Sequence, residues 1–336
     1  MQTRENALHE WLKTIYPTIN FTLTPLAGDA SFRRYYRVQQ DLLSQVVMDA
    51  PPTQVTLAPF VNIAELLTEH GIKTPQIHAI NYTAGFALLE DFGNVLFGDA
   101  IKEPQSMTAL YEGAIRLLCQ MQQSTIQPTQ LAVFDQTFML EEIALFEDWF
   151  LKRYLGLSLS RAEQQLLIDT FQRLTEGIIR QPQVLVHRDY HSRNIMLPDY
   201  PHAVNPFAMG LIDFQDAMLG PIAYDLVSLL KDCYIHLPPE LVSSSLRLFF
   251  DTAQISRHYT LPEFQHAFDW CGLQRHLKIL GIFCRLHFRD NKSNYLHDLP
   301  LTFQYIMACA ETYQEFSAFA QWLHDRVKNP FMSARQ

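Results

Sequence analysis

The pattern of apolar residues changes near residue 100, and this change constrains the fold more than any other feature of the chain. Before it, short alternating segments predict strands over 21–26, 32–38, 45–49, 76–81 and 86–90. Apolar residues at helical spacing predict helices over 6–16 and 58–70. The sequence therefore predicts a β-rich first part, in which one helix follows the third of five strands.

From residue 100 onward the apolar spacing is mostly helical. The expected helices cover 106–122, 138–155, 160–180, 222–234, 239–257, 261–288 and 300–324. Two of them begin with capping boxes, Ser160-x-x-Glu163 and Thr260-x-x-Glu263. We therefore expect an α+β fold of two lobes, with an antiparallel β lobe over 1–92 and a mainly helical lobe over 93–336.

The charge balance argues against two large classes of partner. The chain of 336 residues has 26 basic and 35 acidic side chains, and its net charge is −9. Nucleic acids and anionic membrane surfaces both need a basic stripe, so neither is an expected partner, and no obligate protein partner is indicated. No secretory signal or membrane span is expected, and the five scattered cysteines are typical of reduced thiols, which favours the cytoplasm.

Polar residues lie close to two short apolar runs between residues 184 and 219. The first run, 184–186, leads to Asp189 and Asn194, and the second, 210–214, contains Asp213. Apolar residues next to these polar groups indicate side chains that are held at strand ends. A carboxylate and an amide five residues apart, with a second carboxylate on the next strand, suit phosphoryl transfer, in which one Asp accepts a hydroxyl proton and the other two groups hold Mg²⁺.

These residues resemble the catalytic motifs of kinases. The segment His187-Arg188-Asp189-x-x-x-x-Asn194 is similar to the kinase catalytic loop, and Ile212-Asp213-Phe214 is similar to the metal-binding Asp motif. Together with Gly220-Pro221-x-x-Tyr224-Asp225-Leu226, they resemble the aminoglycoside phosphotransferase family of small-molecule kinases. Segments 28–37, 48–52 and 284–295 are similar to its bacterial cell-wall-recycling branch, the anomeric kinases of N-acetylmuramate and N-acetylglucosamine.

The resemblance implies a protein-kinase-like fold and an ATP-dependent sugar kinase. Asp189 would be the catalytic base, and Asn194 and Asp213 would be the Mg²⁺ ligands. His187 and Asp225 would support the catalytic loop. Backbone groups of the segment Glu90-Asp91-Phe92, between the lobes, would pair with adenine, and the acceptor would be a small sugar.

The sequence departs from the kinase pattern where the phosphates of ATP are bound. Glycine is scarce, with 12 residues, and the chain lacks both G-x-G-x-x-G and the P-loop pattern. It also has no lysine between Lys13 and Lys73, where kinases place one on the third strand. We expect Arg33 or Arg34, after the turn that contains Gly28, to replace that lysine; Arg37 is the other nearby cation.

The acceptor site is indicated by less specific residues, and other functions stay open. The candidates are Asp148, Arg193, Arg285, Arg289 and Asp290. Several of them fit an ion pair or a solvated surface equally well. Within the same fold, the acceptor could be an aminoglycoside, choline or a homoserine-type alcohol. From other classes, His187 and His191 with the two aspartates would suit a metal-dependent hydrolase, and the missing lysine would suit a nucleotide-binding scaffold without turnover.

Overall fold

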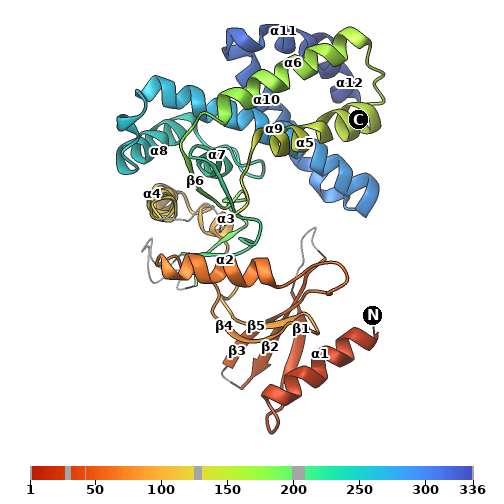
Figure 1. Ribbon diagram of the computed structural model, residues 1–336, viewed down its shortest axis with the longest axis vertical. Helices are drawn as coiled ribbons and strands as arrows, with labels where there is room; N and C mark the ends of the chain where they lie inside the picture. The colour runs from red at the N-terminus through yellow and green to blue at the C-terminus, as the bar shows by residue number, and fades with distance from the viewer. Residues whose placement is uncertain (1, 27–31, 42, 125–130, 199–208, 335–336) are drawn as a thin grey trace. The chain divides into compact units, whose positions relative to one another are not determined.

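A computed structural model describes residues 2–26, 32–41, 43–124, 131–198 and 209–334 (Figure 1). The described residues form two compact units, one of residues 2–95, 196–198 and 209–216, and one of residues 96–195 and 217–334. The first unit thus includes residues from the segment around Asp213. The division of the chain at residue 92 stays a prediction.

The first unit is built on a five-stranded antiparallel sheet. Its strands are β1 (Thr22–Pro25), β2 (Arg34–Gln40), β3 (Leu43–Asp49), β4 (Ile77–Asn81) and β5 (Phe86–Glu90), in the order β1-β2-β3-β5-β4. The short strand β8 (Gly210–Leu211) pairs with β7 (Ile195–Met196). The five strands expected from the sequence are confirmed, with α2 (Ala58–Glu69) after the third.

Both faces of this sheet are covered. On one face, the helix α1 (Gln2–Ile15) packs Leu8 and Leu12 against the sheet residues Tyr36, Val38, Val47, Phe86 and Leu88. Figure 1 shows α2 on the other side of the sheet from α1. Gly85 makes the tight turn between β4 and β5 with a φ of 74°, and a Cβ there would lie 2.0 Å from the Ala50 carbonyl oxygen. Only glycine fits this turn.

The second unit is mostly helical. Its α-helices are α3 (Phe97–Ala100), α4 (Pro104–Gln122), α5 (Gln136–Leu145), α6 (Arg161–Ile178), α7 (Tyr224–Leu230), α8 (Pro239–Thr252), α9 (Leu261–Asp290), α10 (Leu299–Thr312), α11 (Ser317–Trp322) and α12 (Lys328–Ser333). The π-helices are η1 (Phe146–Tyr154) and η6 (Leu323–Val327). The 3-10 helices are η3 (Ile255–Arg257), η4 (Ser293–Asp298) and η5 (Gln314–Phe316). The strands β6 (Gln183–Val186) and β9 (Met218–Pro221) form an antiparallel pair.

The helix α9 is the centre of this unit. It has 30 residues, packs against α5, α6, α7 and α10, and is buried along most of its middle. At Gly281 it crosses α5 so closely that a Cβ would lie 2.3 Å from the Leu145 carbonyl carbon. The helix therefore brings residues far along the chain next to the loop after β6.

The helical part agrees with the sequence in type and differs in detail. Both capping boxes are confirmed, since Ser160 and Thr260 each exchange hydrogen bonds with the Glu three residues later. The single helix expected over 138–155 is α5 followed by the π-helix η1, and the one expected over 300–324 is broken after Thr312. The α+β class, with an antiparallel sheet followed by a mainly helical part, is confirmed. Among the described helices, none has the length and apolarity needed to cross a membrane.

Candidate active site

The loop after β6 is held in a strained backbone conformation. Arg188 has a φ of 75°, in the left-handed region that side-chain-bearing residues rarely adopt. Asp225, buried in the first turn of α7, accepts hydrogen bonds from the N–H of His187 at 2.6 Å and of Arg188 at 2.9 Å. Burial raises the pKa of Asp225 to about 7, although both hydrogen bonds favour its charged form. The contact expected between Asp225 and this loop is present.

The same loop brings Asp189 and Asn194 together. The Asn194 Nδ2 donates to the Asp189 carbonyl oxygen at 3.0 Å, and the His191 N–H donates to the same oxygen at 3.0 Å. His187 is buried and its Nδ1 accepts from the Asp189 N–H at 3.4 Å, so it acts within the loop. Because the amide nitrogen of Asn194 makes this bond, its Oδ1 points away from the loop carbonyl.

The Asp189 carboxylate faces a set of positive charges. Both terminal nitrogens of Arg275 lie 3.3 Å from the Asp189 Oδ1, and the Asp189 side chain is 43% exposed. Desolvation opposes ionisation, but the charges of Arg275, Lys278, His191 and Arg188 outweigh it and hold the pKa of Asp189 well below its usual range. Asp189 is therefore ionised at neutral pH and can accept a proton.

A buried ionic network lies behind the loop, and the sequence analysis missed it. Glu142 of α5 pairs with Arg188 and with Lys278 of α9, the latter at 2.7 Å, and Gln274 donates to the same carboxylate at 3.4 Å. The available signal was the polar run Gln274-Arg275-His276 with Lys278, in the middle of an otherwise apolar helix. Buried charges of this kind are stable only when they are paired.

Asp213 belongs to the first unit and is also strained. Its φ is 62°, and its Oδ1 accepts from the Gln215 Nε2 at 2.8 Å. The adjacent Phe214 is buried and stacks on Phe60 of α2, with ring centroids 5.0 Å apart. Burial and the nearby Asp213 charge raise the pKa of Tyr35 on β2, while Arg33 acts on that hydroxyl in the opposite sense. Arg33 and Asp213 thus both act electrostatically on Tyr35 within this unit.

Of the other arginines near the third strand, Arg37 forms an ion pair, and Arg34 lies beside a carboxylate that pairs with another residue. Arg37 donates its Nε to the Asp91 Oδ2 at 2.6 Å and its Nη1 to the Asn94 Oδ1 at 2.8 Å. Arg34 lies opposite Asp49, whose carboxylate pairs with Arg4 of α1 at 2.6 Å. The turn at 28–31 that precedes these arginines lies outside the described residues. Arg33 is the candidate cation on the Asp213 side of the sheet.

The segment expected to contact adenine already forms several hydrogen bonds within the protein. The Glu90 N–H donates to the Gln76 carbonyl at 2.8 Å, and the Asp91 side chain binds Arg37 and the Gly93 N–H. Phe92 is buried, and Gly210 packs so closely on its ring that a Cβ there would lie 2.2 Å away. The side chains of Asp91 and Phe92 are thus engaged within the protein, and a contact between the backbone of this segment and a nucleotide base stays a prediction.

The acceptor candidates do not form one cluster. Asp148, on η1, is exposed and pairs with Lys152 at 3.0 Å, and Arg289 pairs with Asp290 at 2.9 Å near the end of α9. Burial and Arg289 lower the pKa of Arg285. Arg193 differs from these, because it belongs to the Asp189 loop and its guanidinium lies 3.4 Å from the centre of the Tyr234 ring. Of this group, Arg193 is the one that belongs to the same loop as the proposed base.

The chemistry of the loop fits Mg²⁺, and the described residues offer no richer metal centre. No group of three or more His, Cys, Asp or Glu side chains converges within the described ranges, so His187 and His191 form no hydrolase-type cluster there. An amide oxygen and a carboxylate are hard ligands, and Mg²⁺ commonly keeps several waters beside one or two such groups. Asn194 and Asp213 have the right chemistry for that role.

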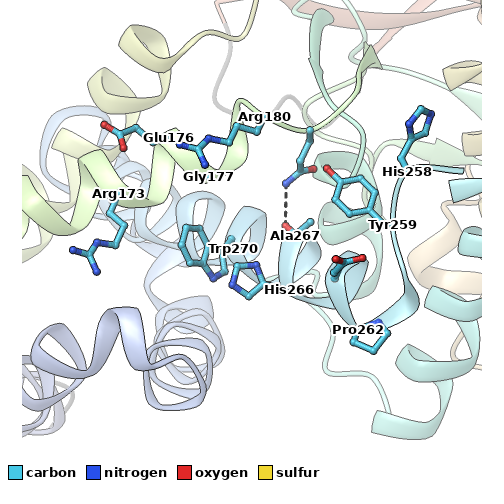
Figure 2. Close-up of a pocket in the computed structure, with 12 residues that line it drawn as sticks. Arg173, Glu176, Gly177, Arg180, His258, Tyr259, Pro262, His266, Ala267 and Trp270 are labelled. Atoms are coloured by element: carbon cyan, nitrogen blue, oxygen red, sulfur yellow. Dashed lines mark hydrogen bonds between the residues drawn. The ribbon is translucent and has the colours of Figure 1, made fainter. Parts of the chain in front are cut away.

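A separate pocket of about 730 Å³ lies between α6 and the start of α9 (Figure 2). Its wall includes Arg173, Arg180, Tyr259, His266 and Trp270, and Figure 2 shows Trp270 beside His266. The Trp270 ring also packs on Gly177, where a Cβ would lie 2.5 Å from it. No residue of the Asp189 loop lines this pocket, so it is distinct from the candidate active site.

Known proteins resemble this chain over most of its length. The phosphotransferase enzyme family matches residues 22–258. An N-acetylmuramate/N-acetylglucosamine kinase of Neisseria meningitidis serogroup B is 37% identical over 321 residues, which cover 94% of this chain and 93% of that protein. The kinase of the same name from Pseudomonas putida is 39% identical over 288 residues, covering 85% of this chain and 82% of the relative.

A solved structure shows the same fold at low identity. The GDP complex of aminoglycoside 2'-phosphotransferase-IIIa superimposes with a TM-score of 0.63, covering 91% of this chain and 99% of that one, at 17% identity. Such a likeness establishes the fold alone, and the functional argument depends on the residues of the site.

Proposed function

Because this chain belongs to the phosphotransferase enzyme family, we propose that it transfers the terminal phosphoryl group of ATP to a hydroxyl of an N-acetylated amino sugar. The observation that carries the proposal is the Asp189 loop. It combines a carboxylate with a lowered pKa, a strained backbone held by Asp225, and an amide whose nitrogen is bound to the Asp189 carbonyl, so that its oxygen does not face that carbonyl. Together these groups suit proton transfer and metal binding in one place.

Asp189 orients the acceptor hydroxyl and takes its proton. The hydroxyl oxygen forms a bond to the γ-phosphorus, the bond from that phosphorus to the bridging oxygen of ADP breaks, and the proton moves to the Asp189 carboxylate and then to solvent. In phosphoryl transfer the transition state is loose, so a carboxylate of low pKa is sufficient as the acceptor of this proton. Positioning then contributes more than base strength.

Asn194 and Asp213 are proposed to hold Mg²⁺, which supplies positive charge to the phosphates when bound. Hydrogen bonds already orient both groups, from Asn194 Nδ2 to the Asp189 carbonyl and from Gln215 to Asp213. Arg33 is proposed to contact the phosphates in place of the missing lysine. Backbone groups of residues 90–92 are proposed to contact the base.

The acceptor proposed is N-acetylmuramate, N-acetylglucosamine or both, at the anomeric hydroxyl. The relatives that share 37–39% identity with this chain are named for these two sugars. Arg193 supports the choice, because a guanidinium beside the loop suits the carboxylate that N-acetylmuramate carries. The proposed location of the reaction is the cytoplasm, where ATP is available, and its proposed role is cell-wall recycling.

Sugar-dependent release of ADP tests this proposal. The purified protein is incubated with ATP and Mg²⁺ and with each of N-acetylmuramate, N-acetylglucosamine, choline, homoserine and an aminoglycoside. At least one of the two sugars should give turnover, and phosphorus NMR of the product should show a phosphate on the anomeric carbon. Turnover with another acceptor, or a phosphate at another position, would overturn the assignment.

A further inference from the structure

Arg275 is a buried cation in the middle of α9, at a distance of 86 residues along the chain from Asp189. It is 3% exposed. A guanidinium at this depth is expensive unless its donors are paired, so its partners indicate why it is there. Its Nη1 donates to the Arg188 carbonyl at 2.6 Å, and both terminal nitrogens lie 3.3 Å from the Asp189 Oδ1.

These bonds complete the support of the strained Arg188 residue. Its N–H is held by Asp225 and its carbonyl by Arg275, so the peptide groups on both sides of the Arg188 Cα are fixed. A left-handed conformation at a residue such as arginine costs about 1–3 kcal/mol and persists where surrounding contacts over-determine it. The loop geometry therefore depends on a bond from α9.

We propose that Arg275 is a positioning residue, which fixes the direction of the Asp189 carboxylate through one oxygen and leaves the other for the acceptor hydroxyl. This inference rests on the proposed function, in which Asp189 is the base. Arg275 acts through Asp189 and the Arg188 carbonyl and does not itself touch the acceptor. No feature of the motif after β6 specifies it.

The test compares Arg275→Gln and Arg275→Lys with the unchanged protein at pH 7. With Arg275→Gln, kcat should fall by about tenfold to a hundredfold while KM for ATP stays within about twofold. Arg275→Lys keeps a cation at this position and should recover kcat in part, because the paired bonds of the guanidinium are lost.

A matched control breaks another ion pair of α9. Lys231 pairs with Asp269 at 2.6 Å, and Lys231→Met should lower the melting temperature without lowering kcat. A kcat of Arg275→Gln equal to the wild-type value would overturn the inference. So would a fall in kcat that is no greater than the fall caused by Lys231→Met.

The Asp189→Asn background separates this inference from the proposed function. If Arg275 acts through Asp189, adding Arg275→Gln or Arg275→Lys to Asp189→Asn should change kcat little further. Full additivity of the two losses would contradict the inference. Normal turnover of Asp189→Asn alone would instead contradict the proposed function. Arg275→Lys, the smaller change, provides the same comparison if Arg275→Gln does not fold.

Discussion

At the scale of single residues, two positions with strained backbone lie at or next to residues of the proposed active site. Arg188, beside Asp189, and Asp213 both have positive φ values. Strain of this kind is kept where a side chain has to point in a direction that a relaxed backbone would not give. The motifs His187-Arg188-Asp189 and Ile212-Asp213-Phe214 identified these residues from the sequence. The backbone strain and the surrounding cations could be identified only from the structure.

Arg193 should distinguish the two proposed acceptors. It lies over the Tyr234 ring, and only N-acetylmuramate carries a carboxylate for it to bind. Arg193→Met should raise KM for N-acetylmuramate by about tenfold, since a charge-assisted hydrogen bond is lost, and leave KM for N-acetylglucosamine within about twofold. Arg153→Met is the matched control, because Arg153 lies over Trp149 on η1 in a similar contact. Equal changes in both KM values would contradict the role of Arg193.

Asp213 should set the Mg²⁺ requirement. Asp213→Asn should raise the Mg²⁺ concentration for half-maximal nucleotide binding by at least about tenfold, because a charged oxygen ligand becomes neutral. Titration calorimetry with ADP at several Mg²⁺ concentrations measures it without turnover. Asp216→Asn changes an exposed carboxylate three residues along the same segment and should have no such effect. A Mg²⁺ requirement equal in both variants would contradict the assignment.

At the scale of helices and strands, most of the fold follows from local pattern. The strands, α2 and both capping boxes were predictable because each depends on alternation, helical spacing or a four-residue motif. The π-helix η1 and the break after Thr312 were not, because the helical spacing of apolar residues continues through both. Arg275 and Glu142 were missed because their partners lie far along the chain, so the polar run in α9 could not be connected to the loop after β6.

The crossing of α9 and α5 predicts opposite effects for two glycines on one helix. Gly281→Ala should lower the free energy of unfolding by about 1–3 kcal/mol, because the new Cβ meets the Leu145 backbone at 2.3 Å. Gly272→Ala meets only side-chain atoms at 3.6 Å or more and should raise that free energy by up to about 1 kcal/mol through helix propensity. Urea denaturation measures both. Equal effects of the two substitutions would contradict the close crossing.

The cap of α6 predicts a pH-dependent contribution to stability. Glu163 binds the Ser160 N–H and, far along the chain, Arg326 at 2.7 Å and Trp322 at 3.0 Å. Arg326, then Ser160 and Trp322, lower the pKa of Glu163 to about 2. A carboxylate with a lowered pKa stabilises the fold above its unfolded pKa, and this contribution is lost as the pH falls through the folded value.

Glu163→Gln should therefore lower the free energy of unfolding by about 1–2 kcal/mol at pH 7. The difference from wild type should shrink as the pH is lowered from about 4.5 towards 2. Urea denaturation at pH 7 and pH 3 measures this. Glu263→Gln, which changes the local cap of α9 at Thr260, should have a smaller effect at pH 7. A Glu163→Gln difference that is the same at both pH values would contradict the role of the carboxylate charge.

At the scale of the whole molecule, the proposed function depends on residues from both units. Asp189, Asn194 and Arg275 belong to the second, and Arg33 and Asp213 to the first. The missing glycine motifs exclude a glycine-rich phosphate-binding loop. In the structure, Arg37 and Asp49 each form an ion pair. The cation that replaces the missing lysine is proposed to be Arg33, on the Asp213 side of the sheet.

The most direct test of the central claim is the rate of sugar-dependent ADP release by Asp189→Asn. We expect this variant to fold with an unchanged circular dichroism spectrum, and we expect kcat with N-acetylmuramate or N-acetylglucosamine to fall by about a hundredfold to ten-thousandfold. Asp251→Asn, an exposed carboxylate at the end of α8, should keep the wild-type rate. A folded Asp189→Asn protein that turns over at the rate of Asp251→Asn would contradict the account.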